Sequence, residues 1–239
     1  MDPLMEGKIV VITGSTRGIG RAMAGRFAAE GARVVVHGRR EADAASVAET
    51  IPGALAVGAD ISDRAACDAL VARVNEEWGA PAVLVNNAGI SSRDAVTRVV
   101  DEDWDRVLEV NLSGPLYVAR AVIPGMKANG GGVIINVTST AGTHGMVGFS
   151  SYAASKAGLV GLTLTWAKEL APFGIRVNAL APGAITDMMR ELPPDLLQPI
   201  VDRGLPTAEA VADAGLFLAS DLSRTVTGQV IHAIGRPPD

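Results

Sequence analysis

Residues 8–20 read Lys-Ile-Val-Val-Ile-Thr-Gly-Ser-Thr-Arg-Gly-Ile-Gly, an apolar run followed by a glycine-rich turn. The apolar run 8–12 is typical of a buried parallel strand, and residues 18–30 have the pattern of the helix that follows it. Glycines between the two allow a tight turn and a close backbone approach. A pyrophosphate can then lie on the helix N-terminus, where free amides and the helix dipole favour anions. The spacing is Gly-x-x-x-Gly-x-Gly, not the common Gly-x-Gly-x-x-Gly, and it predicts a dinucleotide-binding turn.

The alternation of strand and helix patterns continues along the whole chain. The expected strands are 8–13, 33–37, 54–59, 82–86, 133–137, 175–181 and 229–233, and the expected helices are 18–30, 42–50, 64–78, 103–127, 151–170 and 208–219. This order predicts an α/β, doubly wound, three-layer fold with a seven-stranded parallel sheet and its ligand at the carboxyl ends of the strands. Residues 1–239 show no repeat or linker, so we expect a single domain. The prolines within 187–204 interrupt the pattern.

Composition narrows the possible functions. The 239 residues are 48% hydrophobic, which suits one domain with a sizeable core, and the net charge of -5, with no basic tract, argues against nucleic-acid binding. The lone Cys67 excludes an internal disulfide and favours a reducing cytoplasm. The first residues lack a signal-peptide pattern and no apolar run is long enough for a membrane span, so no membrane contact is expected. The three histidines show no ligand spacing, and we expect no metal.

A second pattern lies in the middle of the chain, where Ser139 precedes Tyr152-Ala-Ala-Ser-Lys156. Side chains four residues apart share one face of a helix. An ammonium about 5 Å from a phenol, in an effective dielectric of about 20, favours the phenolate by about 3 kcal/mol, or roughly two pKa units. Tyr152 then becomes usable as a general acid and base, and Ser139 can hydrogen-bond the oxygen on which charge develops. Alone, a Tyr-x-x-x-Lys would fit a solvated helix equally well.

Taken together, these motifs resemble those of the short-chain dehydrogenase/reductase family. The resemblance extends from about Gly7 to Gly228. It is carried by Thr13-Gly14-x-x-x-Gly18-x-Gly20, Asp60, Asn86-Asn87-Ala88-Gly89, Asn111, Ser139, Tyr152, Lys156 and Pro182-Gly183. The resemblance implies a Rossmann-type fold and an oxidoreductase that interconverts a ketone and a secondary alcohol by hydride transfer. Within the family, the 3-oxoacyl-carrier-protein reductases are similar in pattern.

The resemblance also implies roles for individual residues. The catalytic residues would be Asn111, Ser139, Tyr152 and Lys156. The cofactor-binding residues would be Gly14, Ser15, Thr16, Arg17, Gly18, Ile19, Gly20, Gly38, Arg39, Arg40, Asp60, Ile61, Asn87, Ala88, Gly89, Tyr152, Lys156, Pro182, Gly183, Ile185 and Thr186. Three alternatives stay open: Asp60 caps the next turn or Ser62 caps the next helix, Asn111 is a satisfied polar residue at a helix kink, and Pro182-Gly183 is a plain strand-ending turn.

The end of the second strand decides the cofactor. An acidic residue there would accept hydrogen bonds from the adenosine ribose and repel a 2′-phosphate. The chain instead has Gly38 and Arg39, with Arg17 in the glycine-rich turn. Two guanidinium groups on one ribose suit a phosphate, so we expect NADP(H), with NAD(H) as the alternative.

The sequence also departs from the family pattern. Where basic residues would hold an acidic carrier beside the active site, it has Asn129 and Phe173, which favours a free ketone or alcohol. The pocket wall 143–150, with Met188 and Met189, is mostly small and apolar and suits a hydrophobic substrate. The substrate lid, about 186–206, is shorter than usual, and 233–239 replaces the usual C-terminal end.

The sequence also leads to expectations about the oligomeric state and about alternative functions. Apolar residues assigned to the outer faces of two long helices, Leu116, Val118, Leu162 and Trp166, predict a homo-oligomer, a tetramer or else a dimer. An NAD-dependent alcohol dehydrogenase and a 3-oxoacyl-carrier-protein reductase remain alternatives on the same scaffold. A regulator that binds NADP without turnover is disfavoured because Tyr152 and Lys156 are both present. A methyltransferase would have no use for them.

Overall fold

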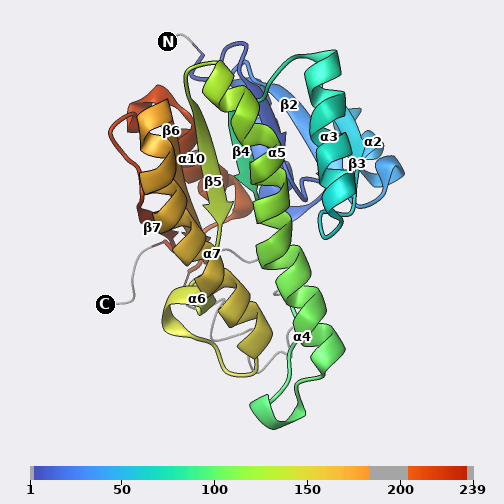
Figure 1. Cartoon of the computed structure of the whole chain (residues 1–239), viewed down its shortest axis with the longest axis vertical. Coiled ribbons are helices and arrows are strands. Elements are labelled where there is room, and N and C mark those ends of the chain that lie inside the picture. The colour runs from blue at the N-terminus through green and yellow to red at the C-terminus, as the bar shows by residue number, and fades with distance from the viewer. Residues whose placement is uncertain (1–2, 184–203, 236–239) are drawn as a thin grey trace.

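The computed structural model describes residues 3–183 and 204–235. Its strands are β1 (Ile9–Ile12), β2 (Arg33–Gly38), β3 (Leu55–Gly58), β4 (Val83–Asn86), β5 (Gly132–Val137), β6 (Ile175–Pro182) and β7 (Val230–Ala233). They form one seven-stranded sheet in the order β3-β2-β1-β4-β5-β6-β7, in which all neighbours are parallel. The order reverses between β1 and β4, which is where doubly wound folds bind ligands. The predicted fold class is confirmed (Figure 1).

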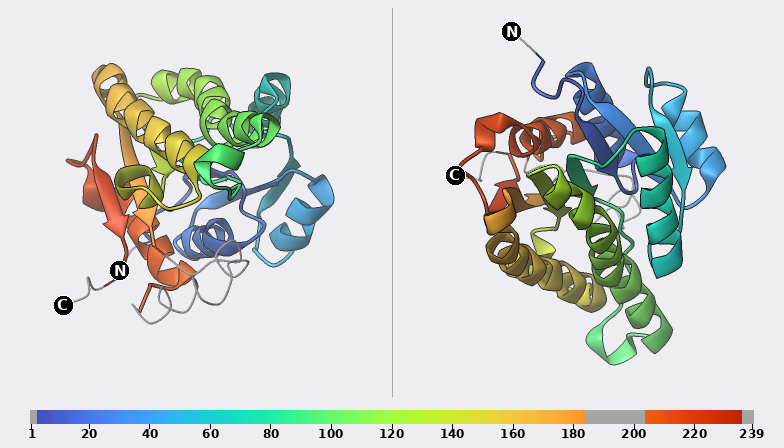
Figure 2. Two further views of the ribbon diagram at one scale, coloured as in Figure 1. Left: turned by 90° about the horizontal axis from the view of Figure 1, so that it is seen from below. Right: turned by 45° about the horizontal axis from the view of Figure 1, so that its top comes forward.

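Helices cover both faces of this sheet, as Figure 2 shows from two further directions. The helices are α1 (Gly18–Ala29), α2 (Glu41–Ala48), α3 (Arg64–Glu77), α4 (Asp101–Leu108), α5 (Gly114–Ala128), α6 (Ala141–His144), α7 (Ser150–Leu170) and α10 (Ala208–Ala219), with 3-10 turns η1 (Val96–Arg98), η3 (Ala171–Phe173) and η4 (Asp221–Ser223). Helices α1, α2 and α10 pack on one face, and α3, α5 and α7 pack on the other.

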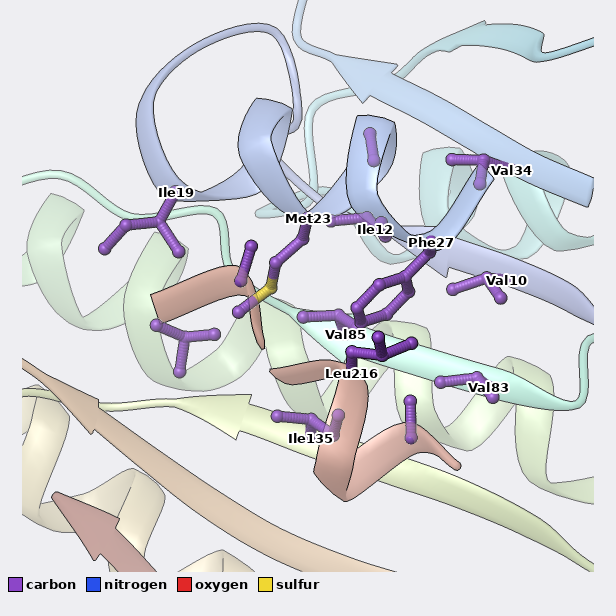
Figure 3. Packing of buried hydrophobic residues seen from close by; sticks show 14 of the residues in the cluster. Val10, Ile12, Ile19, Met23, Phe27, Val34, Val83, Val85, Ile135 and Leu216 are labelled. Carbon is purple, nitrogen blue, oxygen red and sulfur yellow. The ribbon is translucent and has the colours of Figure 1, made fainter. Parts of the chain in front are cut away.

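The inner strands read as apolar runs because both of their faces are buried. In β1, Val10 and Ile12 face the core beneath α1 and α10, whereas Val11 faces the core beneath α3 and α5. Figure 3 shows the first core, in which Phe27 and Met23 of α1 lie over the strands. Fully burying a side chain of this kind contributes about 1.5–3 kcal/mol, so the two cores hold the strand ends in fixed relative positions.

Two details of the helices differ from the prediction. The helix expected over 103–127 is three pieces, α4, a π-helical turn η2 (Glu109–Ser113) and α5. The residue that caps α3 is Asp63, which accepts a hydrogen bond from the amide of Ala65, so the open alternative in which Ser62 caps this helix does not hold. Ser62 is unavailable because its hydroxyl donates to Asp60 and accepts from Arg106.

The prediction of which residues are exposed on the outer faces of α5 and α7 is also wrong in part. Val118 and Trp166 are buried in the core, so they are not the surface residues that the sequence suggested. Leu116 is half-exposed and Leu162 is partly buried, while Leu164, which was not predicted, is 44% exposed. The apolar surface on these two helices therefore rests on Leu116 and Leu164.

Candidate functional site

The carboxyl ends of the strands carry the predicted site. The turn between β1 and α1 is pressed against the loop after β4, since a Cβ on Gly14 would lie 2.7 Å from the Cα of Ala88. Gly14 also has φ of +64°, which favours glycine. The side-chain amide of Asn87 donates to the carbonyls of Thr13 and Gly14, both at 2.9 Å. Asn87 and Ala88 thus act as scaffold for the turn.

The remaining residues of the turn divide into inward and outward positions. Ser15 is fully buried, and its hydroxyl donates to the carbonyl of Ile12 at 2.7 Å, so its side chain supports the turn from beneath. Ile19 and Gly20 are buried at the start of α1, while Thr16 and Gly18 are partly exposed and Arg17 is exposed. The first amides of α1 have no partner within the helix, which leaves them for an anion.

The end of β2 places three predicted cofactor residues beside this turn. Gly38 leaves room for Thr16, because a Cβ at Gly38 would lie 2.7 Å from the Cγ2 of Thr16. Arg40 forms a two-pronged pair with Asp43, both contacts at 2.8 Å. Arg39 and Arg17 are exposed, and within the described part of the chain neither forms an ion pair. Both arginines are therefore available to a phosphate.

Asp60 and Ile61 follow β3 at the same edge. One carboxylate oxygen of Asp60 accepts from the amide and hydroxyl of Ser62, which is the predicted turn cap, and the other accepts from Arg106 at 2.8 Å. Burial opposes the charge, but these hydrogen bonds and the Arg106 cation together lower the pKa of Asp60 to about 2. Ile61 is buried. Sequence reasoning missed Arg106, because no motif marks this residue. It lies on α4 and is identified only by its contact with Asp60.

The predicted catalytic residues meet where α6 packs on α7. Ser139 follows β5, and Gly142 of α6 is so close to α7 that a Cβ there would lie 2.7 Å from the carbonyl carbon of Lys156. This contact brings Ser139 to Tyr152. Burial raises the pKa of the Tyr152 phenol, and a hydrogen bond with the Ser139 hydroxyl lowers it in part. The sequence predicted that Lys156 lowers the pKa of Tyr152, but in the protein alone burial raises this pKa.

Lys156 is buried, and its ammonium donates to the carbonyl of Val137 at 2.9 Å. The ammonium nitrogen lies 5.7 Å from the centre of the Tyr152 ring. Burial lowers the pKa of Lys156 to about 8, so its proton is held less firmly than that of a surface lysine. Gly89, which follows β4, lies between this ammonium and Asn111, since a Cβ there would contact both at 3.2–3.4 Å.

Asn111 lies in the π-helical turn η2 and is fully buried. Its side-chain oxygen accepts from the amide of Ile90 at 2.9 Å, and its side-chain nitrogen donates to the carbonyl of Ile90 at 2.8 Å and to Ser155 at 3.1 Å. These contacts fit the alternative in which Asn111 is a hydrogen-bonded polar residue at a helix irregularity. Gly89 also brings the Asn111 side chain close to Lys156.

Two contacts that sequence reasoning missed join the loop after β4 to the start of α7. The hydroxyls of Ser92 and Ser151 lie 2.7 Å apart, and Asp94 forms a parallel bridge with Phe149. The Phe149 ring stands edge-on to Tyr152 at 6.2 Å. Neither contact has a sequence signal, because both join residues that are more than fifty positions apart.

At the end of β6, Gly183 donates to the carbonyl of Ala233 at 3.0 Å, so Pro182-Gly183 continues the sheet toward the site. Ile185, Thr186, Met188, Met189, nearly all of the predicted lid and residues 236–239 lie outside the described residues. Within 3–183 and 204–235, no three His, Cys, Asp or Glu side chains gather as a metal site would require, and no helix is long and apolar enough to cross a bilayer.

The positions expected to hold a carrier protein are not beside this chain's own active site. Asn129 precedes β5 and Phe173 precedes β6, whereas Ser139 and Pro182 stand at the other ends of those strands. At about 3.3 Å per residue, the six residues of β5 separate the two ends by roughly 20 Å. Of the basic residues nearby, Lys127 stacks on Phe173. Within one chain, Asn129 and Phe173 therefore give no argument against a carrier-bound substrate, because they do not lie beside the predicted site.

Comparisons with known proteins agree with this geometry. The family described as short chain dehydrogenase matches residues 8–196. The chain is 44% identical to the 3-oxoacyl-[acyl-carrier-protein] reductase of Thermotoga maritima, over 97% of this chain and 98% of that one, and 39% identical to that of Escherichia coli, over 96% and 97%. The 3-ketoacyl-(acyl-carrier-protein) reductase of Brucella melitensis, solved with NADH, aligns with a TM-score of 0.91 at 37% identity over 96% and 98%.

Proposed function

This chain belongs to the short-chain dehydrogenase/reductase family and is an oxidoreductase, and from that premise we propose that it is an NADP(H)-dependent ketoreductase that converts a 3-oxoacyl thioester into the 3-hydroxyacyl thioester. The observation that carries the proposal is the meeting of Ser139, Tyr152 and Lys156 at the carboxyl edge of the sheet. The names of the similar proteins support the substrate class.

Each residue has a defined task in this reaction. A bound nicotinamide dinucleotide would supply the hydride for the carbonyl carbon. The Tyr152 phenol gives its proton to the carbonyl oxygen, and the Ser139 hydroxyl donates a hydrogen bond to the same oxygen as charge develops there. The raised pKa of Tyr152 keeps the phenol protonated at neutral pH, which is the state that reduction needs.

The site residues fit a dinucleotide. The turn after β1 leaves room for backbone approach, and Lys156 stands beside Gly89 at the end of β4. Arg39 follows Gly38 and Arg17 follows Thr16, which lies against Gly38, so both arginines belong to the segments where a 2′-phosphate would lie. These two arginines favour NADP(H) over NAD(H). NAD(H) is the second candidate, because the similar Brucella melitensis protein was solved with NADH.

The apolar side chains between α6 and α7 favour a substrate with an acyl chain. Met146 and Val147 are exposed, Val147 to 95%, and they lie on the segment that leads from α6 to the start of α7. An apolar chain that covered them would bury surface worth about 25 cal/mol per Å². A methyl ketone without an acyl chain would lack this contact.

The test is a spectrophotometric assay at the nicotinamide band, with the same 3-oxoacyl chain attached to pantetheine, to coenzyme A and to an acidic carrier protein. We expect turnover with NADPH on all three thioesters and weak turnover with small free ketones. No oxidation of NADPH by any of them would overturn the substrate class, and faster turnover with NADH would overturn the cofactor assignment.

The proposal also includes the oligomeric state of the protein and its location in the cell. We expect a homo-oligomer, a tetramer or else a dimer, that uses the apolar residues Leu116 and Leu164 on α5 and α7. Light scattering at micromolar concentration should show it, and replacing both leucines with glutamate should shift the mass toward the monomer. A monomeric wild-type protein would contradict this part. A cytoplasmic location fits the free, buried thiol of Cys67.

A further inference from the structure

We propose that His37 is the positioning residue of the dinucleotide edge, and that its imidazole clamps the glycine-rich turn to the loop after β3. The inference rests on the proposed function, because it gives a task to a buried polar side chain beside the cofactor residues. His37 is only 2% exposed and stands one position before Gly38 at the end of β2.

The imidazole joins two chain segments that are far apart in the sequence. Its Nδ1 accepts from the amide of Gly14 at 3.0 Å, and its Nε2 donates to the carbonyl of Ala59 at 3.1 Å. A backbone amide can only donate and a carbonyl can only accept, so both contacts are satisfied together only by the neutral ring with its proton on Nε2. The side chain therefore has one permitted tautomer.

The backbone of His37 strengthens the same connection. Its amide donates to the hydroxyl of Ser15 and its carbonyl accepts from the amide of Ser15, both at 2.9 Å. On the opposite side Ala88 leaves no room for a Cβ at Gly14. The turn is thus held between β2 and the loop after β4.

The surroundings favour the neutral ring. Burial lowers the pKa of His37 to about 4, although the hydrogen bond to the Ala59 carbonyl and the carboxylate of Asp60 act in the opposite direction. Asp60 is itself held by Arg106 and Ser62. The clamp consequently connects the turn that receives the pyrophosphate with the loop that carries Asp60 and Ile61.

The proposal predicts a selective loss of dinucleotide affinity. His37→Phe keeps a ring but leaves the Gly14 amide and the Ala59 carbonyl without a partner. We expect it to weaken binding of both NADPH and NADH by about tenfold to a hundredfold, measured by fluorescence titration, with kcat at saturating cofactor within about threefold of wild type. His37→Gln retains a donor and an acceptor and should recover part of the affinity.

The matched control is Val34→Ala, which removes buried volume from the other end of the same strand. It should lower Tm without a selective loss of dinucleotide affinity. Loss of affinity in His37→Phe no greater than in Val34→Ala would overturn the inference. If wild type bound neither dinucleotide, the proposed function would fail instead.

The wild-type protein allows a test that needs no variant. Nitrogen-15 NMR of the imidazoles should show one histidine that carries its proton on Nε2 and stays neutral from pH 5 to 8. A His37 ring that titrates near the usual pKa of about 6.5 would overturn the proposed clamp.

Discussion

The ammonium nitrogen of Lys156 lies 5.7 Å from the centre of the Tyr152 ring and donates its hydrogen bond to the backbone carbonyl of Val137. The lysine is thus directed at the end of β5 and is itself made less basic by burial. Burial also raises the pKa of the phenol. Both shifts favour the uncharged forms in the protein alone, so the phenol keeps its proton while the ammonium of Lys156 is a stronger acid than that of a surface lysine.

Tyr152→Phe removes the transferable proton and keeps the ring. Turnover should fall by at least a hundredfold, equivalent to about 2.7 kcal/mol of transition-state stabilisation, while the Kd for NADPH stays within about twofold. Tyr117→Phe, which changes the only other tyrosine, is the control and should retain full activity. Activity of Tyr152→Phe within about tenfold of wild type would remove Tyr152 from the mechanism.

Lys156→Met removes the charge and keeps most of the buried volume. Turnover and dinucleotide affinity should both fall, because we propose that the ammonium serves both the phenol and the ribose of the cofactor. The pH profile of any residual alcohol oxidation should move to higher pH, since a phenol without a nearby cation loses its proton less readily. Lys168→Met, on an exposed position of the same helix, is the control. An unshifted profile would contradict the electrostatic role.

Arg39→Ala and Arg17→Ala should each reduce NADPH affinity by about tenfold to a hundredfold, because a charge-assisted contact to the 2′-phosphate contributes about 1.5–3 kcal/mol. NADH affinity should change little. Arg40→Ala is the matched control, since the Arg40 guanidinium is already paired with Asp43. Equal losses for both dinucleotides would mean that the arginines act through the fold, and a wild-type preference for NADH would refute the phosphate assignment.

The depressed pKa of His37 predicts a pH dependence of stability. The unfolded chain binds a proton near pH 6.5 and the folded protein only near pH 4, so the free energy of unfolding should decrease as pH falls from 6.5 to 4. The full loss is on the order of 3 kcal/mol. Urea unfolding at pH 7 and pH 4.5 measures it. The decrease should be smaller in His37→Phe, and an equal decrease there would assign it to other groups.

The sequence predicted the sheet well because the inner strands face two cores. Val10, Val11 and Ile12 are all buried, which produces a continuous apolar run, and a glycine-rich turn follows it. Local patterns carry information of this kind. The order of motifs also identified the family, and with it Ser139, Tyr152 and Lys156.

The differences come from contacts between distant segments. The π-helical turn accompanies the bonds between Asn111 and Ile90, and Ser62 loses its capping role to Asp63 because Arg106 engages it. Helical periodicity assigned Val118 and Trp166 to the surface because α5 and α7 are apolar on more than one side. The pKa of Tyr152 depends on burial, and no spacing along the chain reports burial.

The pairing of β1 with β4 has a consequence for how the protein folds. Val10 pairs with Val83, so the central pair of the sheet forms only after a long intervening stretch has been synthesised and its ends have been brought together. Closing such a loop is entropically unfavourable until the contact forms, and folding slows as contacts become less local. The last strand, β7, pairs with β6 across fifty residues as well. During synthesis on the ribosome, strands β1 to β4 can therefore assemble early, whereas β7, whose Ala233 carbonyl accepts from Gly183, joins at the end.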